Sequence, residues 1–156
     1  EPKYKQFDVS FVGGWANNGF DEKRKIIIET FTAFKDSGLK CGFFVNKDLS
    51  HQQECDLLAN SKITLNIHDA YQRQLGTDTN ERTYKSLGLT GFLISDKVEA
   101  LDNIFPELPQ AATPKKMAEL ITQYMDLNLD EIKEKNRQDI LENHTYVNRA
   151  KQMMEL

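Results

Sequence analysis

The fold of this chain is decided by the stretch Asn80-Glu-Arg-Thr-Tyr-Lys-Ser-Leu-Gly-Leu-Thr-Gly-Phe-Leu-Ile94, in which a polar helix start leads through two glycines into an apolar strand. Upstream, Ile63-Thr-Leu-Asn-Ile67 is a short apolar run typical of a strand. Strand, polar loop, helix and strand therefore follow one another as one βαβ unit. Such a unit places the start of its helix beside the carboxyl ends of the strands, where doubly wound proteins bind ligands.

The helix start near Asn80 has the properties of an anion site. The first N–H groups of a helix have no partner within the helix and carry part of the positive end of its dipole, so they attract phosphate. Arg82 adds a guanidinium that can donate two parallel hydrogen bonds. We expect Asn80, Arg82 and Thr83 to contact phosphate. The alternative for Arg82 is a surface or packing salt bridge with the acids around it.

Strands and helices alternate along the rest of the chain. Helix starts are indicated by Asp21, by Ser50 with Glu54 nearby, and by Thr113-Pro114. Parallel strands need crossovers that bury both faces of a sheet, so the pattern predicts an α/β fold with a Rossmann-like, doubly wound, mostly parallel sheet. The strands are expected at 7–12, 41–45, 63–67, 91–94 and 109–112. The helices are expected at 21–37, 50–59, from 80, from 114, from 130 and at the end of the chain, with a short helix or turn at 98–104.

Two segments carry further expectations. The stretch 68–79 is expected to be a long loop that faces ligand, because long ordered loops usually carry function. The closing segment is expected to form a helix that folds back over the sheet, with Met153 and Met154 in the core or in a domain interface.

Composition indicates one ordinary globular domain. The chain has 156 residues, of which 39% are hydrophobic and 28% charged, so residues 7–156 can form a single core and residues 1–6 read as a linker. The formal charge of −4 and the scattered Lys and Arg residues argue against a nucleic-acid partner. No apolar run approaches the length of a membrane span, and no secretion signal opens the chain, so we expect a soluble, cytoplasmic protein. Cys41 and Cys55 have no metal-ligand spacing, and we expect buried, reduced thiols and no metal.

The carboxyl edge of the predicted sheet gathers the other candidate ligand residues. Gly13-Gly14 allows a phosphate or sugar to approach the backbone closely, or is a simple strand-to-helix turn. Trp15 would stack on a base or sugar, or would be partly buried packing. His68 would be a ligand-facing donor or a solvated loop histidine. Further candidates at or near this edge are Asn46, Asn66, Asp78 and Lys85.

Five motifs occur in a recognisable order: Asp8-Val-Ser-Phe-Val-Gly13, Thr64-Leu-Asn66, Asn80-x-Arg82-x-Tyr84, Gly88-x-x-Gly91-Phe-Leu and His144-Thr-Tyr146-x-x-Arg149. Together they resemble the carboxy-terminal domain of CgeB-type glycosyltransferases, also described as spore maturation proteins or group 1 glycosyltransferases. The resemblance extends over nearly the whole chain. Each motif is weak alone, but their common order makes chance agreement improbable.

The resemblance implies the GT-B architecture, in which two Rossmann-like domains face a cleft and this chain is the carboxy-terminal half. It implies a nucleoside-diphosphate sugar as donor, with the diphosphate at Gly13-Gly14 and at the helix that starts near Asn80. Arg82 would neutralise phosphate charge, so transfer would need no metal and no cofactor. The acceptor, and usually the catalytic base, would come from an amino-terminal domain outside this sequence. Catalytic residues are therefore unknown here, and the domain alone would bind without appreciable transfer.

One departure from the family opens an alternative. Relatives usually carry a Glu that holds the donor ribose where this chain has Lys85, and many carry a second acid where it has Thr77. A lysine cannot accept hydrogen bonds, so the ribose contact would have to change, with Asp78 and Glu81 as the nearest substitutes. The second hypothesis is therefore a catalytically degenerate module that binds a sugar nucleotide or a partner.

A third hypothesis is a flavodoxin-like or receiver-like signalling domain, which has a similar alternation of strands and helices. Receiver domains need acids near the ends of their first and third strands, whereas Asp8 starts its strand and Asn66 is an amide. The sequence therefore disfavours this hypothesis. For His144, Tyr146 and Arg149 the favoured interpretation is structural, with these side chains holding the last helix across the domain.

Overall fold

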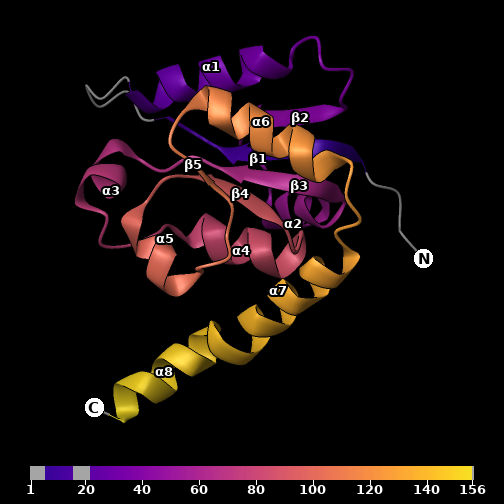
Figure 1. Cartoon of the computed structure of the whole chain (residues 1–156). Helices are drawn as coiled ribbons and strands as arrows, with labels where there is room; N and C mark the ends of the chain where they lie inside the picture. The colour runs from indigo at the N-terminus through magenta and orange to yellow at the C-terminus, as the bar shows by residue number, and fades with distance from the viewer. Residues whose placement is uncertain (1–5, 16–21, 156) are drawn as a thin grey trace.

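A computed structural model describes residues 6–15 and 22–155 of the chain. Its sheet contains β1 (Phe7–Gly13), β2 (Cys41–Val45), β3 (Ser61–Asn66), β4 (Leu93–Asp96) and β5 (Gln110–Ala111). The strands lie in the order β2-β1-β3-β4-β5, and every pair is parallel (Figure 1). This arrangement confirms the predicted α/β fold.

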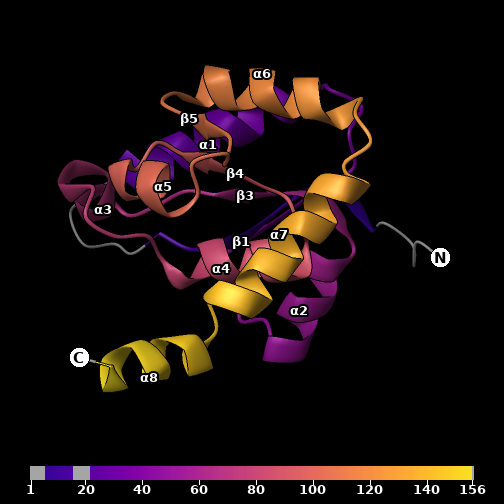
Figure 2. The same cartoon turned by 60° about the horizontal axis from the view of Figure 1, so that its bottom comes forward.

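Helices cover both faces of the sheet. On one face lie α1 (Glu22–Phe34) and α6 (Pro114–Met125), which contact each other. On the other face lie α2 (His51–Ala59), α4 (Glu81–Leu89) and α7 (Asp130–Asn143), as Figure 2 shows from a second direction. The sheet is therefore doubly wound, with its helices in two outer layers.

Apolar strand residues explain why both faces must be covered. Along the central strands Val9, Phe11, Ile63 and Leu65 have no exposed surface, which is typical of a parallel sheet buried between helices. Burying a side chain of this size contributes about 1.5–3 kcal/mol. A second apolar cluster lies among α4, α5 (Glu99–Ile104) and α7, and its buried members are Leu87, Leu93, Val98, Ala100, Leu101, Phe105 and Ile140.

The strand order places a topological switch point at the carboxyl edge of the sheet. The chain passes from β1 through α1 to β2 on one side, then returns through α2 to β3 on the other side of β1. The connections after β1 and β3 therefore diverge, and ligands of doubly wound proteins bind outside the strand ends at such a switch point. The order β2-β1-β3-β4-β5 is the flavodoxin-type version of this architecture.

The helix starts that the sequence predicted are largely confirmed. Ser50 forms a capping box at the start of α2, although its partner is Gln53 and not Glu54. Thr113 accepts a hydrogen bond from the Lys116 N–H at the start of α6. Asp21, the predicted cap of α1, lies outside the described residues.

The predicted loop 68–79 contains a short helix, so this part of the prediction is wrong. Helix α3 (Ala70–Leu75) follows Asp69 and ends at Gly76, whose φ of 65° is the left-handed conformation that ends many helices. Ala70 and Gln72 are buried, which gives the segment a reason to fold against the domain. An Asp and a Gly that bracket six residues are the sequence signal for this helix.

The closing helix does not fold back over the sheet, so that prediction is also wrong. Helix α8 (Tyr146–Met154) begins at a capping box of Thr145 and Asn148 and extends away from the domain (Figure 2). It has no buried residue, and Met153 and Met154 are 75% and 79% exposed. Core packing of these methionines is therefore excluded, while their place in a domain interface stays a prediction.

Three smaller expectations have mixed outcomes. Among the predicted linker residues only Gln6 is described, and its N–H donates to the Asn60 carbonyl. Cys41 and Cys55 are free, but both are half-buried and not fully buried as expected. Burial, and secondly the charge of Asp8, raises the pKa of the Cys41 thiol.

Within the described residues no helix has the length and apolar character needed to cross a membrane.

Candidate functional site

The structure brings most of the predicted ligand residues to the carboxyl ends of β1, β2 and β3. Gly13 ends β1, Asn46 follows β2, and Asn66 ends β3, while Asn80 is the N-cap of α4. These positions come from four separate segments of the chain. The parallel sheet places them at one edge, as the sequence predicted.

The side chain of Asn80 does not cap its own helix. Its Oδ1 accepts a hydrogen bond from Asn66 Nδ2 at 2.8 Å, and its Nδ2 donates to Asn66 Oδ1 at 3.3 Å. No side-chain cap hydrogen bond is formed at the start of α4. The first turn of α4 therefore keeps N–H groups that an anion can use.

Arg82 lies against the end of β1. A Cβ atom added to Gly13 would lie 3.1 Å from Arg82 Cζ, and the guanidinium lies 6.0 Å from the centre of the Phe11 ring. Within residues 6–15 and 22–155 its guanidinium forms no hydrogen bond or ion pair. Burial lowers the pKa of this guanidinium, and Glu54, Asp69 and Glu81 oppose that effect. An arginine side chain stays protonated at neutral pH, so its charge is available to an anion.

The Gly13-Gly14-Trp15 segment is held by Asn46. Asn46 adopts a left-handed backbone conformation with φ of 51°, donates its N–H to the Gly13 carbonyl at 2.9 Å, and accepts the Trp15 N–H on Oδ1 at 3.1 Å. A Cβ at Gly14 would lie 2.5 Å from that same Oδ1, so only glycine fits there without a shift. The guanidinium of Arg24 lies 5.6 Å from the Trp15 ring. Asn46 thus has a structural role that its sequence pattern did not indicate.

A small polar hollow of about 190 Å³ opens beside the start of α4. Two of its cations are already paired, because Lys23 Nζ lies 2.9 Å from Asp69 Oδ1 and Lys85 Nζ lies 3.1 Å from Glu54 Oε2. Arg82 is the cation of this hollow without such a partner among the described residues. The lining residues are Lys23, Glu54, Asp69, Asn80, Glu81, Arg82 and Lys85.

His68 is fully buried, so its interpretation as a solvated loop histidine is wrong. Its Nδ1 lies 2.7 Å from Asp96 Oδ1, and its Nε2 lies 2.7 Å from Thr79 Oγ1. Both ring nitrogens are therefore in use. Direct contact between His68 and a ligand stays a prediction and requires the ring to release one of these partners.

The other candidates differ in their surroundings. Thr83 is fully buried and lies 2.7 Å from Thr79 through their hydroxyl oxygens. Asp78 is exposed, and its Oδ1 accepts a hydrogen bond from Gln72 at 3.4 Å. Lys85 lies between Glu54 and Glu81, with the second pair at 3.7 Å. The position at which the resemblance implied an acid is therefore occupied by an ion-paired ammonium group.

Three residues near this edge were missed by the sequence interpretation, namely Lys23, Thr79 and Asp96. Asp96 ends β4 and is 4% exposed, and an acid at the carboxyl end of an apolar strand is the signal that could have identified it. Lys23 and Thr79 have no comparable local signal, because their roles arise from Asp69 and His68 across the fold.

His144 contacts the domain as the structural interpretation expected. Its ring lies 4.9 Å from the Phe105 ring and 5.6 Å from the Tyr84 ring, between centroids, and Arg149 lies within hydrogen-bonding distance of Nδ1. Burial lowers the pKa of His144, Arg149 adds to that effect, and Asp139 opposes it. Tyr146 is 84% exposed, so its expected packing is wrong.

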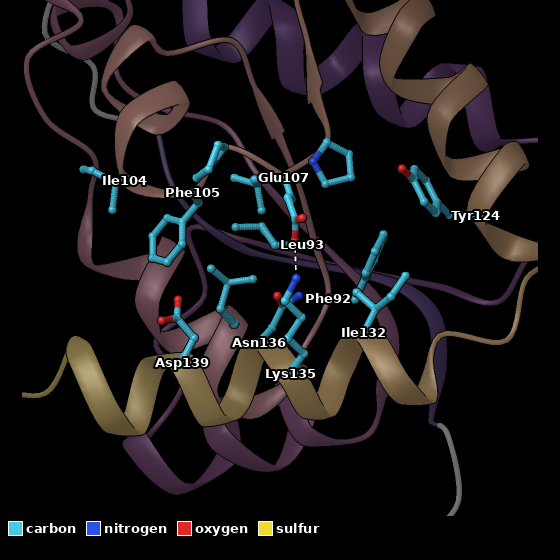
Figure 3. Close-up of a pocket in the computed structure, with 14 residues that line it drawn as sticks. Phe92, Leu93, Ile104, Phe105, Glu107, Tyr124, Ile132, Lys135, Asn136 and Asp139 are labelled. Atoms are coloured by element: carbon cyan, nitrogen blue, oxygen red, sulfur yellow. Dashed lines mark hydrogen bonds and ion pairs between the residues drawn. The ribbon is translucent and has the colours of Figure 1, made fainter.

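The larger hollows lie away from the strand ends that hold the predicted residues. An apolar cavity of about 480 Å³ lies where β4 begins, between α7 and the segment that precedes β5 (Figure 3). Phe92 and Tyr124 line it, and the exposed ion pair of Lys135 and Glu107 lies at its border with an N–O distance of 2.6 Å. None of the predicted ligand residues lines this cavity. A third, more open hollow of about 600 Å³ lies among α4, α7 and α8 and includes Lys85.

The described residues contain no group of three or more His, Cys, Asp or Glu side chains arranged to hold a metal ion. The receiver-like alternative also lacks its acids in the structure. Asp8 lies near the start of β1, where its Oδ2 accepts the Lys40 N–H at 2.8 Å, and Asn66 ends β3 as an amide paired with Asn80.

The comparison with protein families gives one match. The model of a family described as "Glycosyl transferase-like" matches residues 5–155. The matched range contains all the helices and strands of the structure and all the residues predicted to bind ligand. No curated protein matches the chain.

Proposed function

The chain belongs to the family of glycosyl transferase-like proteins, and we propose that it is the part of such an enzyme that binds the sugar donor. The donor is a nucleoside-diphosphate sugar. Its diphosphate lies at the switch point of the sheet, between the Gly13-Gly14 segment and the first turn of α4. The domain is the carboxy-terminal half of a GT-B enzyme of the CgeB type.

The observation that carries this proposal is the state of Arg82. Its guanidinium lies beside Gly13, is half-buried, and has no hydrogen-bond or ion-pair partner among the described residues. A guanidinium that is half-buried without a protein partner has its donors available to acceptors from a ligand, which would replace water there. A diphosphate fits, because its oxygens accept the paired hydrogen bonds that a guanidinium donates.

The same residues support chemistry without a metal. When a sugar leaves its nucleoside diphosphate, negative charge increases on the leaving phosphate. The uncapped first turn of α4 and the guanidinium of Arg82 stabilise that charge at a fixed position. The acceptor and the catalytic base come from an amino-terminal domain. The proposal includes a cytoplasmic location, which agrees with the free state of Cys41 and Cys55.

Binding of nucleoside diphosphates tests the proposal directly. We expect one of UDP, GDP, dTDP or ADP to stabilise the domain selectively, with affinity measured by calorimetry. At 100 times its dissociation constant a ligand adds about 2.7 kcal/mol, which raises the unfolding midpoint by roughly 5–11 °C. Arg82→Ala should abolish this shift because it removes the main phosphate contact.

Arg149→Ala is the matched control for that variant. It removes the same charge from an exposed position on α8 and should leave the shift unchanged. Equal binding by Arg82→Ala and wild type would refute the proposed phosphate site. Transfer by the isolated domain would refute the separate role of the amino-terminal domain.

The degenerate module is the second candidate, and one observation favours it. Lys85 Nζ is ion-paired with Glu54 and Glu81, so the position that would hold the donor ribose offers no hydrogen-bond acceptor of its own. In this version the domain keeps the phosphate site but has lost the ribose contact, and it binds a sugar nucleotide without turnover.

A further inference from the structure

Five polar side chains form a continuous hydrogen-bonded line beneath the start of α4. Thr83 Oγ1 lies 3.0 Å from Asn66 Nδ2 and 2.7 Å from Thr79 Oγ1. Thr79 Oγ1 lies 2.7 Å from His68 Nε2, and His68 Nδ1 lies 2.7 Å from Asp96 Oδ1. The line therefore joins the ends of β3 and β4 to the first turn of α4.

The Asp96 carboxylate at one end determines which atom donates and which accepts in each hydrogen bond of this line. The Asp96 carboxylate can only accept, and it already accepts the His68 backbone N–H at 3.0 Å, so the proton of neutral His68 lies on Nδ1. Nε2 then accepts from the Thr79 hydroxyl, Thr79 accepts from Thr83, and Thr83 accepts from Asn66. Each hydroxyl donates once and accepts at least once, so each link depends on the next.

Four of the five side chains of this line are almost completely buried, so their hydrogen bonds compete little with water. His68, Thr83 and Asn66 have no exposed surface, and Asp96 is 4% exposed. Arg73 Nη1 lies 3.5 Å from Asp96 Oδ2 and partly balances the carboxylate charge. A buried polar network of this kind is stable only when its members are paired, so loss of one link disturbs its neighbours.

The far end of the line lies at the first turn of α4, where the proposed phosphate site is located. Asn66 uses one amide hydrogen on Thr83 and the other on Asn80 Oδ1, which keeps the Asn80 side chain away from the N–H groups of its own helix. We propose that His68 and Asp96 are positioning residues that act through Thr79 and Thr83 to keep the start of α4 uncapped and open to the donor diphosphate. This inference rests on the proposed function.

A matched pair of variants at Thr79 tests the inference. Thr79→Val has the same shape but no hydroxyl, so it breaks the link between His68 and Thr83, whereas Thr79→Ser keeps it. The probe is inorganic pyrophosphate, which carries the diphosphate chemistry without a choice of base, titrated at constant ionic strength into the full chain and followed by amide NMR shifts. We expect Thr79→Val to bind about fivefold more weakly, in the range for one lost hydrogen bond, and Thr79→Ser to bind like wild type.

A second readout needs no ligand. The ¹⁵N shifts of the His68 ring report which nitrogen carries the proton, and wild type and Thr79→Ser should both show an unprotonated Nε2 that accepts a hydrogen bond. In Thr79→Val the Nε2 shift should move towards that of a free nitrogen, while the dispersion of other amides shows that the fold is intact. A purely structural role for Thr79 would lower stability without changing pyrophosphate affinity relative to Thr79→Ser.

Arg82→Ala separates failure of this inference from failure of the proposed function. Weak binding by Arg82→Ala together with normal binding by Thr79→Val would overturn the positioning role and leave the donor site standing. A wild-type chain that shows no pyrophosphate-dependent shifts would overturn the proposed phosphate site, and the positioning role with it. Weak binding by both variants, with normal binding by Thr79→Ser, is the expected result.

Discussion

At the scale of single residues, Lys85 separates the two candidate functions. It stands where the sequence resemblance implied an acid, and its ammonium group lies 3.1 Å from Glu54 and 3.7 Å from Glu81. Lys85 and Glu54 are both largely buried at the side chain, with exposed fractions of 22% and 20%. A simple change of Lys85 to an acid therefore alters the local charge balance as well as any ribose contact.

Exchanging the charges of Lys85 and Glu54 separates the effect on the local charge balance from the effect on a ribose contact. Lys85→Glu alone places a third carboxylate beside Glu54 and Glu81, and it should lower the free energy of unfolding by about 1 kcal/mol. Lys85→Glu combined with Glu54→Lys restores one opposite charge and should recover most of that loss in urea denaturation. Calorimetry with the nucleoside diphosphate that binds best then compares the double variant with wild type. A large gain in affinity supports the degenerate module, and equal affinity identifies Lys85 as a tolerated variation.

At the scale of elements, α4 supplies residues of the candidate site and also packs against α7 and α2 in its layer. Its first turn presents Arg82, while its last turn contacts α7 through Gly88 and passes into β4 through Gly91. The two glycines look alike in sequence but have different surroundings. At Gly88 an added Cβ would lie 3.4 Å from Ile140 Cγ2, which is an ordinary contact. At Gly91 φ is +82°, and a Cβ would lie 2.7 Å from Lys133 Cβ.

The same substitution should therefore have opposite effects at these two positions. Gly88→Ala should raise the free energy of unfolding by about 0.5–1 kcal/mol, because alanine loses less conformational freedom within a helix. Gly91→Ala should lower it by more than about 1 kcal/mol, because the left-handed conformation is strained for alanine and the Lys133 backbone is in the way. Chemical denaturation of both variants measures this. Destabilisation by Gly88→Ala would show that the α4–α7 contact has no room for a methyl group.

At the scale of the whole molecule, α8 differs from the other described helices in having no buried residue. None of its residues is buried, and it exposes Tyr146, Val147, Met153 and Met154. Its described hydrogen bonds to the preceding residues are those of Asn148 with the Glu142 carbonyl and of Arg149 with His144, whereas its capping box of Thr145 and Asn148 lies within the start of the helix itself.

Removal of residues 145–156 should therefore leave the domain nearly as stable as before. We expect the free energy of unfolding to fall by less than about 1 kcal/mol, since exposed residues away from the core contribute little. Ile140→Ala is the control, because this side chain is 9% exposed and its truncation should cost about 2 kcal/mol or more. A loss of several kcal/mol on removal of α8 would mean that the helix packs on the domain in solution.

The sequence by itself determined the class of fold, the succession of the strands along the chain, and which of the expected ligand residues lie at the carboxyl ends of those strands, but it missed α3. These features follow from local patterns: apolar runs for buried strands, Ser50 and Thr113 for helix starts, and the two glycines that lead from α4 towards β4. The same kind of pattern predicted Arg82 and the Gly13-Gly14 segment as phosphate contacts, and the structure places them beside each other. Each depends on residues within a few positions of one another, so the chain pattern contains the information.

Only the tertiary structure decided the partners of the side chains at the site. Asn80 pairs with Asn66 and not with its own helix, His68 is buried between Asp96 and Thr79, and α8 extends from the domain. Asn66 and Asn80 are 14 positions apart, and His68 and Asp96 are 28 apart. A polar side chain that can hydrogen-bond locally or across the fold takes whichever partner satisfies it once water is excluded, and that choice exists only after the sheet has formed.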